Sequence, residues 1–314
     1  MEGVGEFGMK DSPYFKQAQL MLRVMPHVAS EECFALKGGT AINLYVRDMP
    51  RLSVDIDLTY LPLEPRDTAL ANIGEALQRI AAAIGRTVPG ATVQESRAKG
   101  ARHVSKLFIQ TTEAAIKIEP NLVLRGTVFS PEERELSEKA EALFEASATA
   151  STLAVVDLYG GKLCAALDRQ HPRDIFDVKI LMENEGITDE IRTAFIIYLA
   201  SHDRPMSELL APNLKDFRQV FEKEFAGMTA EEVEHDELVT VRDRLIDTIK
   251  NTMTENEKQF LLSIKQGQPD WSLMPVAGIE QLPAIQWKLV NIRKMDKKKQ
   301  IESLQKLQAA LGYE

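Results

Sequence analysis

Two aspartates, Asp55 and Asp57, are separated by one residue within the apolar segment 52–61. Because side chains alternate along a strand, the two carboxylates point to one face and the intervening apolar residues to the other. Neighbouring carboxylates repel each other, which disfavours the ionisation of both, and a shared cation relieves that repulsion. The pattern favours a strand that binds Mg²⁺ together with substrate phosphates, as in metal-assisted nucleotidyl transfer. The alternative is an edge strand with a solvated acidic face.

A glycine-rich turn precedes this strand. Gly38, Gly39 and Thr40 follow an apolar strand, 34–36, and precede a helical stretch, 41–45. A strand–turn–helix unit of this kind presents backbone N–H groups and a hydroxyl at a helix N-terminus, which suits a phosphate. In an ordinary turn, glycine would supply the unusual dihedral angles and Thr40 would cap the helix. The spacing to the aspartates, with room for a short helix and a return strand, favours a nucleotide site.

A later strand, 115–119, repeats the alternation, so that Lys117 and Glu119 share one face. If it lies beside the first strand, Glu119 supplies a third carboxylate, which can bind metal or accept a proton from an attacking hydroxyl. Lys117 would moderate the repulsion among the acids. The alternative is a Lys/Glu pair on an exposed sheet face.

Lys162 follows two glycines within an amphipathic helix, 157–169, where each glycine costs about 1 kcal/mol relative to alanine. Close packing or close approach of a ligand would explain that cost. Lys162 is expected to contact an anion such as a triphosphate, or else to reach water along its apolar stem. Asp174 and Asp177 lie one turn apart at the start of the next helix. They either support a nucleotide site that faces Lys162 or favour the helix dipole.

Composition restricts the class of protein. The chain has 314 residues and a net charge of −9, which disfavours nonspecific binding of nucleic acid by the whole surface. Residues 284–314 are the exception, with seven basic and three acidic side chains. No apolar run approaches the ~18–20 residues of a membrane span, and the first residues do not resemble a signal peptide. Cys33 and Cys164 lack metal or disulfide spacing, so a cytoplasmic protein without membrane association is expected.

The chain divides by pattern into two parts. Residues 1–150 mix strand and helix signals, with a helix expected at 64–86 and a hairpin of strands 106–110 and 115–119, while 130–150 is expected to lead out of the domain. Residues 151–314 have helical periodicity almost throughout. The expected helices span 155–169, 173–183, 188–201, 214–225, 230–251, 256–266 and 292–310.

Taken together, Gly38-Gly39-Thr40, Asp55-Ile56-Asp57, Lys117-Ile118-Glu119, Lys162 and the segment 173–177 resemble the AbiEii/AbiGii toxin family of nucleotidyltransferases, which includes the MenT-type toxins. The resemblance spans roughly residues 34 to 185. It implies an α+β fold: a polymerase β-like nucleotidyltransferase domain with a mixed sheet, 1–150, followed by an all-helical domain, 151–314, that contributes Lys162 and Asp174 to the cleft.

The resemblance also implies roles for these residues. Gly38, Gly39 and Thr40 would bind the nucleotide with Lys162 and Asp177, and Asp55, Asp57 and Glu119 would bind Mg²⁺. The catalytic set would be Asp55, Asp57, Glu119, Lys162 and Asp174. Thr40 stands where many members carry Ser and keeps the hydroxyl. Glu119 stands where many polymerases carry Asp.

The resulting hypothesis is a Mg²⁺-dependent toxin of a bacterial toxin–antitoxin or abortive-infection system. It would transfer nucleotides from NTP to an RNA acceptor, the tRNA 3′ end, and would have an antitoxin encoded nearby. The basic segment 284–314 favours RNA, because phosphate contacts dominate RNA affinity. The alternatives are a nucleotidyltransferase that modifies a protein or small-molecule hydroxyl, and a nucleotide-binding regulator without transfer activity.

Overall fold

The computed structural model describes residues 10, 12–97, 100 and 102–313. The chain forms two compact units, Met1–Leu158 with Phe225–Val233, and Tyr159–Glu224 with Glu234–Glu314. This division differs from the expected 1–150 and 151–314 in two respects. The change of unit falls within a helix, and a short segment, 225–233, returns to the first unit. There Leu52 donates its backbone N–H to Met228, and Ala230 donates to Pro50.

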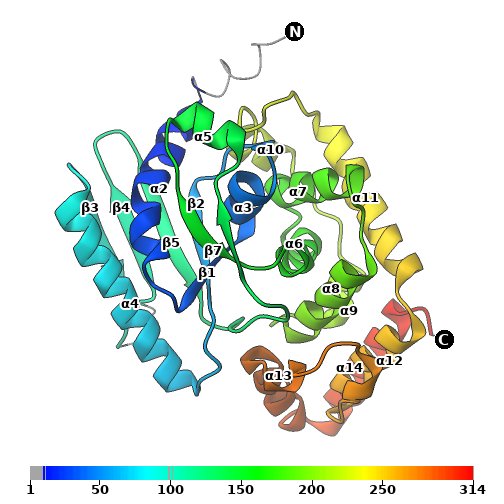
Figure 1. Ribbon diagram of the computed structural model, residues 1–314. Coiled ribbons are helices and arrows are strands. Elements are labelled where there is room, and N and C mark those ends of the chain that lie inside the picture. Colours follow the sequence, from blue (N-terminus) through cyan, green and yellow to red (C-terminus); the bar gives the residue numbers. More distant parts are fainter. Residues whose placement is uncertain (1–9, 11, 98–99, 101, 314) are drawn as a thin grey trace. The chain divides into compact units, whose positions relative to one another are not determined.

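The first unit is built on a seven-stranded mixed sheet in the order β3-β4-β5-β2-β1-β7-β6 (Figure 1). The pairs β2–β5 and β1–β7 are parallel, and the remaining neighbours are antiparallel. The strands are β1 (Phe34–Lys37), β2 (Asp55–Tyr60), β3 (Thr92–Ser96), β4 (Lys106–Gln110), β5 (Ala115–Asn121), β6 (Glu132–Glu135) and β7 (Thr149–Thr152).

Two long helices, α2 (Pro13–Ala29) and α4 (Arg66–Thr87), cover one face of this sheet (Figure 1). Ser12 begins α2 because its hydroxyl accepts the N–H of Tyr14. The apolar stripe of α4 and the alternate apolar residues of the strands form the core between them, as period-3.6 and period-2 patterns require. These buried side chains include Ile73, Leu77, Ile80 and Ile84 of α4 and Ile56, Leu107, Ile109, Ile116 and Ile118 of the strands. The polar residues of the same strands therefore lie on the opposite face.

The expected strands at 34–36, 106–110 and 115–119 are present, and α4 corresponds to the helix expected at 64–86. The stretch expected at 41–45 is a short helix, α3 (Gly38–Ala41), that continues as a π-helix, η1 (Ile42–Val46). The prediction that 130–150 leads out of the domain is wrong. That segment contains β6 and the helix α5 (Glu138–Phe144) and enters β7, which pairs with β1, so it completes the sheet.

The second unit is helical. Its elements are the later part of α6 (Val155–Arg169), α7 (Pro172–Glu183), α8 (Asp189–Ser201), α9 (Met206–Leu210), α10 (Arg218–Glu224), α11 (His235–Thr252), α12 (Glu255–Gln266), η2 (Trp271–Leu273), η3 (Ile279–Gln281), α13 (Pro283–Arg293) and α14 (Lys297–Ala310). The single helix expected at 292–310 is wrong. Asp296 ends that continuity, because its carboxylate accepts the N–H groups of Lys298 and Lys299 and so begins a new helix.

The two glycines of α6 have different surroundings. A Cβ on Gly160 would lie 2.8 Å from the backbone nitrogen of Phe195 and 2.7 Å from Cβ of Ala194, both on α8. A Cβ on Gly161 would meet no atom within 4 Å. Gly160 thus permits close packing of α6 on α8, whereas nothing in the structure explains Gly161.

We expect Gly160→Ala to lower the free energy of unfolding by about 1–3 kcal/mol, because backbone atoms of α8 would have to move. Gly161→Ala is the matched control and should raise it by about 0.5–1 kcal/mol, through better helix propensity. Urea denaturation of the two variants checks this pair. Equal effects of the two substitutions would contradict the packing role of Gly160.

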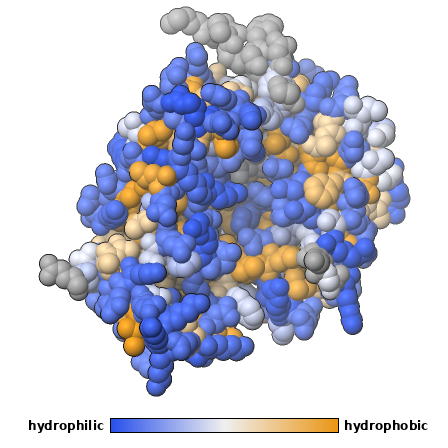
Figure 2. All heavy atoms as spheres, turned by 180° about the vertical axis from the view of Figure 1, so that it is seen from behind, coloured by the Kyte–Doolittle hydropathy of each residue, from blue (hydrophilic) through white to orange (hydrophobic). Residues whose placement is uncertain are grey.

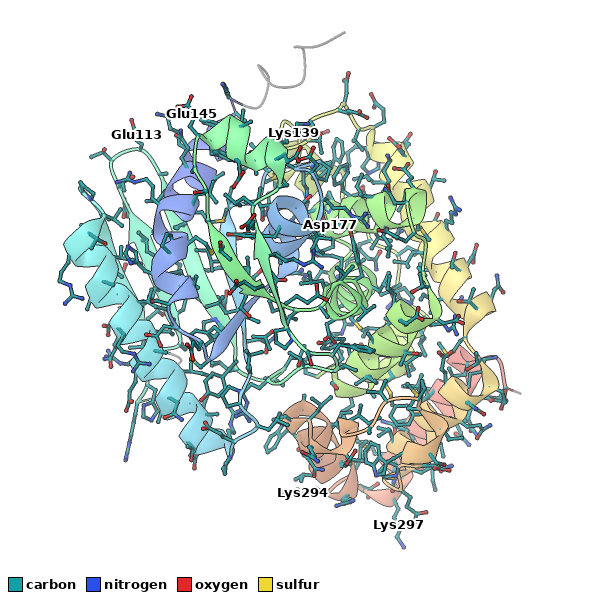
Figure 3. All side chains as sticks on the ribbon, in the orientation of Figure 1. Glu113, Lys139, Glu145, Asp177, Lys294 and Lys297 are labelled. Carbon is teal, nitrogen blue, oxygen red and sulfur yellow. The ribbon has the colours of Figure 1, made fainter. Side chains whose placement is uncertain are left out.

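The face shown in Figure 2 is covered largely by hydrophilic side chains, with apolar groups in separate patches. Among the described residues, no helix combines the length and apolarity that crossing a membrane requires. Lys294 and Lys297, at the junction of α13 and α14, project outward (Figure 3).

Candidate active site

The sheet face opposite α2 and α4 brings the predicted acidic residues into two cross-strand rows. In one row Lys37, Asp57 and Glu119 are neighbours on β1, β2 and β5. In the other, Asp55 on β2 pairs with Lys117 on β5. Since paired residues of adjacent strands point to the same side, all five side chains share the face opposite α2 and α4. The expectation that the strand of Glu119 lies beside Asp55 and Asp57 is confirmed by this register.

The glycine turn lies directly against this face. Gly38 has φ +71°, a conformation that favours glycine, and a Cβ on it would lie 2.9 Å from Oδ2 of Asp57. A Cβ on Gly39 would lie 2.6 Å from a guanidinium nitrogen of Arg51. Gly38 is therefore favoured by its positive φ and by the nearby carboxylate, whereas a side chain at position 39 would require the Arg51 guanidinium to shift. The start of α3 is thereby held against the acidic strand.

Thr40 occupies a different position from the one expected. Its side chain is 1% exposed, and its hydroxyl lies 2.5 Å from the carbonyl oxygen of Asp55 and 2.9 Å from Oγ of Ser53. The hydroxyl is thus engaged within the protein. The sequence had suggested that Thr40 presents its hydroxyl to a nucleotide. In this structure the hydroxyl instead links α3 to the strand that carries both aspartates.

Glu119 also departs from expectation. Its two carboxylate oxygens pair with Lys106 at 2.7 Å and with Lys117 at 2.8 Å. Burial raises the pKa of Glu119, but the hydrogen bonds from both lysines outweigh burial and lower it. A carboxylate held in this way is a weak proton acceptor, and both of its oxygens are engaged by ammonium groups. The role of third ligand or general base is therefore not supported by this conformation.

Lys117 lies at the centre of the acidic face. Burial lowers its pKa, but the hydrogen bond to Glu119 and the charges of Asp55, Glu119 and Asp57 outweigh that effect, so its pKa is raised. Lys117 therefore remains protonated and offsets the repulsion between the aspartates, as the sequence predicted.

The residues on β2 fit a divalent cation by their chemistry. Asp55 and Asp57 carry carboxylate oxygens on one face, the donor type that hard cations prefer, and the missing Cβ of Gly38 lets the glycine turn approach Asp57 closely. Within 12–97 and 102–313, no group of three or more His, Cys, Asp or Glu side chains is placed to bind a metal ion. Two aspartates together with substrate phosphates match the usual coordination of Mg²⁺ at phosphoryl-transfer sites.

The other predicted residues form a buried ionic cluster in the second unit. Nζ of Lys162 lies 2.9 Å from Asp174 and 2.9 Å from Asp177, and Arg169 lies 2.8 Å from Asp174. Lys162 is 6% exposed, so the alternative that its ammonium reaches water is wrong. Burial raises the pKa of Asp174, but Lys162 and Arg169 outweigh burial and lower it to about 2. The cluster joins α6 to the start of α7; Asp177 is labelled in Figure 3.

His171 precedes this cluster and caps α7. Its Nδ1 accepts the N–H of Arg173, and its Nε2 lies 3.2 Å from Glu224. The ring thus serves the start of the helix and a hydrogen bond to Glu224, both of them structural roles.

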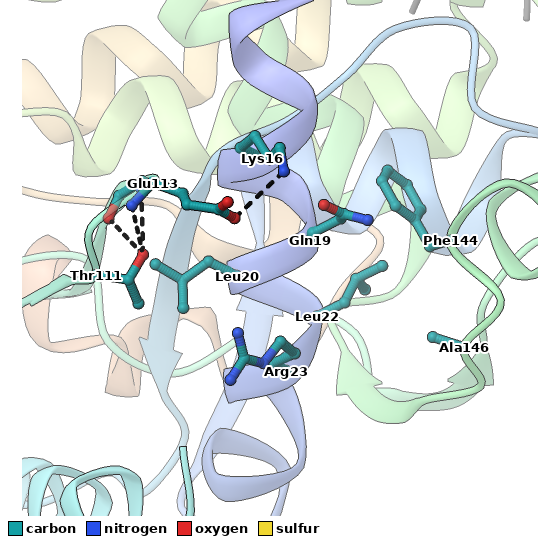
Figure 4. Close-up of a pocket in the computed structure, with 10 residues that line it drawn as sticks. Lys16, Gln19, Leu20, Leu22, Arg23, Thr111, Glu113, Phe144 and Ala146 are labelled. Carbon is teal, nitrogen blue, oxygen red and sulfur yellow. Dashed lines mark hydrogen bonds and ion pairs between the residues drawn. The ribbon is translucent and has the colours of Figure 1, made fainter. Parts of the chain in front are cut away.

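A pocket of about 310 Å³ lies on the helix-covered side of the sheet, beside α2 (Figure 4). The β4–β5 turn and the end of α5 complete its wall. Lys16 on α2 pairs with Glu113 on the turn at 3.2 Å, and both side chains are more than half exposed. The pocket is thus separate from the face that carries Asp55 and Asp57.

Sequence reasoning missed Arg51 and Lys106. Arg51 is 2% exposed and packs on Gly39, yet it lies between Pro50 and Leu52 without a periodic pattern that would reveal it. Lys106 begins β4, and only the hairpin register places it against Glu119. The alternation of 106–110 was the available signal, because it puts Lys106 and Phe108 on one face.

A glycine turn against a strand with alternating aspartates, in a mixed sheet, is an arrangement that suits a nucleotidyltransferase. The family model "Nucleotidyl transferase AbiEii toxin, Type IV TA system" matches residues 19–291. The chain belongs to this family of toxin nucleotidyltransferases and is an enzyme of that class.

Solved structures agree on the fold. MenT4, a nucleotidyltransferase toxin from Mycobacterium tuberculosis H37Rv, superposes with a TM-score of 0.60 at 14% sequence identity, covering 89% of this chain and 93% of that chain. At this identity the likeness shows the fold alone. No curated protein matches the sequence.

Proposed function

We propose that this enzyme transfers a nucleotide from NTP to a hydroxyl of an RNA acceptor, the 3′ end of tRNA, with Mg²⁺ as cofactor. The observation that carries the proposal is the close approach of Gly38 to Asp57, which places the glycine turn beside the acidic strand. In the reaction the acceptor hydroxyl oxygen forms a bond to the α-phosphorus, the bond to the leaving pyrophosphate breaks, and the hydroxyl proton passes to water.

Different residues would bind the triphosphate, bind the metal ion and position these groups. Backbone N–H groups at Gly38 and Gly39 meet the triphosphate, and the cation of Arg51 behind Gly39 favours the same anion. Asp55 and Asp57 hold Mg²⁺, which when bound neutralises phosphate charge. Thr40 positions α3, and Glu119 positions Lys106 and Lys117.

We assign Lys162, Asp174 and Asp177 a structural part in this proposal, in place of direct contact with the nucleotide. The ammonium of Lys162 already neutralises two buried carboxylates within its own unit. The antitoxin of a type IV system is the expected partner, and the gene beside this one is the first place to seek it.

The test is incubation of the protein with total RNA, purified tRNA and each radiolabelled NTP in the presence of Mg²⁺. Label should enter tRNA with one or more NTPs, and periodate oxidation of the tRNA 3′ end beforehand should abolish incorporation. Label in a protein band, with none in RNA, would contradict the RNA acceptor and favour the protein-modifying alternative. Absence of transfer to any acceptor would contradict the enzymatic proposal itself.

A further inference from the structure

An exposed aromatic ring lies on the same face of the sheet as the aspartates. Phe108 on β4 is 42% exposed. It pairs with Lys117 on β5 and with Gln94 on β3, which extends the second row to Asp55, Lys117, Phe108 and Gln94. A single exposed apolar residue is common on protein surfaces, so a role for Phe108 has to be argued from the residues around it.

Two neighbours of Phe108 are lysines, which suit the phosphates of a polynucleotide. Nζ of Lys106 lies 5.8 Å from the centroid of the Phe108 ring, and Lys117 occupies the adjacent position on β5. Glu119 holds both ammonium groups in place. Single-stranded RNA is bound on open sheets by rings that stack on bases and by cations that contact the linking phosphates. The row combines an aromatic ring, Phe108, with a cation, Lys117, and ends at Asp55, a carboxylate assigned to the reaction.

The strand order separates this ring from the turn that receives the triphosphate. β2 lies between β1 and β5, α3 follows β1, and Phe108 lies on β4 beyond β5. Two strand spacings, about 10 Å, separate Phe108 from the strand of Asp55. The nucleotide and the ring thus lie on opposite sides of the acidic strand, which favours the acceptor over the NTP as the ligand of Phe108.

We propose that Phe108 stacks on a base near the 3′ end of the RNA acceptor, while Lys106 contacts an adjoining phosphate. This inference rests on the proposed RNA-directed function and adds the surface by which the acceptor is bound. Phe108 is a positioning residue here, since its ring contacts the acceptor away from the reacting atoms.

Kinetics provide the first test. Phe108→Ala should raise the KM for tRNA by roughly 5- to 150-fold, the range that loss of one base stack produces, while the KM for NTP stays unchanged. Phe108→Trp should retain the wild-type KM, and Phe108→Leu should behave like alanine. Leu63→Ala, at another exposed apolar residue of the same unit, is the control and should have no effect. An unchanged KM for tRNA, or a raised KM for NTP instead, overturns the inference.

A binding experiment separates this inference from the transfer reaction. A short single-stranded oligoribonucleotide should quench the fluorescence of the indole introduced by Phe108→Trp, relative to the wild-type protein with Trp271 and Trp287 alone. An abasic oligonucleotide with the same phosphates should not. Quenching without any transfer would support stacking and contradict the proposed function. Equal quenching by both oligonucleotides, or none, would contradict stacking whatever the transfer assay shows.

Discussion

Asp57→Asn and Asp55→Asn are each expected to reduce nucleotidyl transfer by about a thousandfold or more. Bound metal supplies several kcal/mol of charge stabilisation in the transition state, and each 1.36 kcal/mol is about tenfold in rate. Asparagine keeps the shape of aspartate, so the close contact of residue 57 with Gly38 survives and the fold remains. Incorporation of labelled nucleotide at saturating NTP and Mg²⁺ measures the loss.

The controls distinguish loss of metal from loss of structure. Both aspartates are half-buried, so the free energy of unfolding should change by no more than about 1 kcal/mol. Glu113→Gln removes an exposed carboxylate at the β4–β5 turn of the same unit and should leave activity unchanged (Figure 3). Full activity in either aspartate variant would refute the assignment of β2 as the metal-binding strand.

The acidic face could be predicted from the sequence because it depends on local alternation. Asp55 and Asp57 share a face by the period of a strand, and Lys117 and Glu119 repeat it. The pairing of β2 with β5 needed the resemblance or the structure, since parallel strands are joined by long connections that sequence spacing does not specify. The shared face of the carboxylates was therefore confirmed, but apart from Lys117 the residues packed around this face were not foreseen.

Those partners come from elements that lie apart in the sequence. Lys106 reaches Glu119 across the β4–β5 hairpin, and Arg51 reaches Gly39 from a segment without regular structure. Lys162 illustrates the same limit in the second unit. Its neighbours in sequence suggested an ammonium available to an anion, whereas the packing of α7 on α6 supplies two carboxylates. The alternation of residues in a sequence predicts the face on which a side chain lies. Which charged side chains pair on that face depends on tertiary packing.

Lys162→Met is expected to lower the free energy of unfolding by about 3–5 kcal/mol, a large loss for a single substitution. Methionine keeps the length of the side chain but leaves Asp174 and Asp177 buried without the cation between them. Lys179→Met is the matched control on α7, since it breaks pairs with Glu183 and Glu237 at the surface and should cost about 1 kcal/mol or less. Urea denaturation of both variants measures the two losses.

A triple variant separates the two roles considered for Lys162. Lys162→Met combined with Asp174→Asn and Asp177→Asn removes the unpaired charges and should recover part of the lost stability. NTP affinity, measured by calorimetry below the melting temperature, should remain near the wild-type value. Wild-type stability of Lys162→Met together with lost NTP affinity would show instead that the ammonium binds the nucleotide.

The ionic cluster around Lys162 should also contribute to the loss of stability at low pH. The pKa of Asp174 falls from an ordinary value near 4 to about 2 on folding, because Lys162 and Arg169 outweigh the effect of burial. A lowered pKa contributes stability above the unfolded-state value, and that contribution is lost as the pH falls from about 4 to about 2. The difference in free energy of unfolding between the wild type and Asp174→Asn should therefore change by about 2 kcal/mol, against the wild type, as the pH falls across this interval. Guanidinium denaturation of both proteins at pH 5, 4, 3 and 2 measures the difference, and a constant gap between them would show that the Asp174 carboxylate is not held ionised by the cluster.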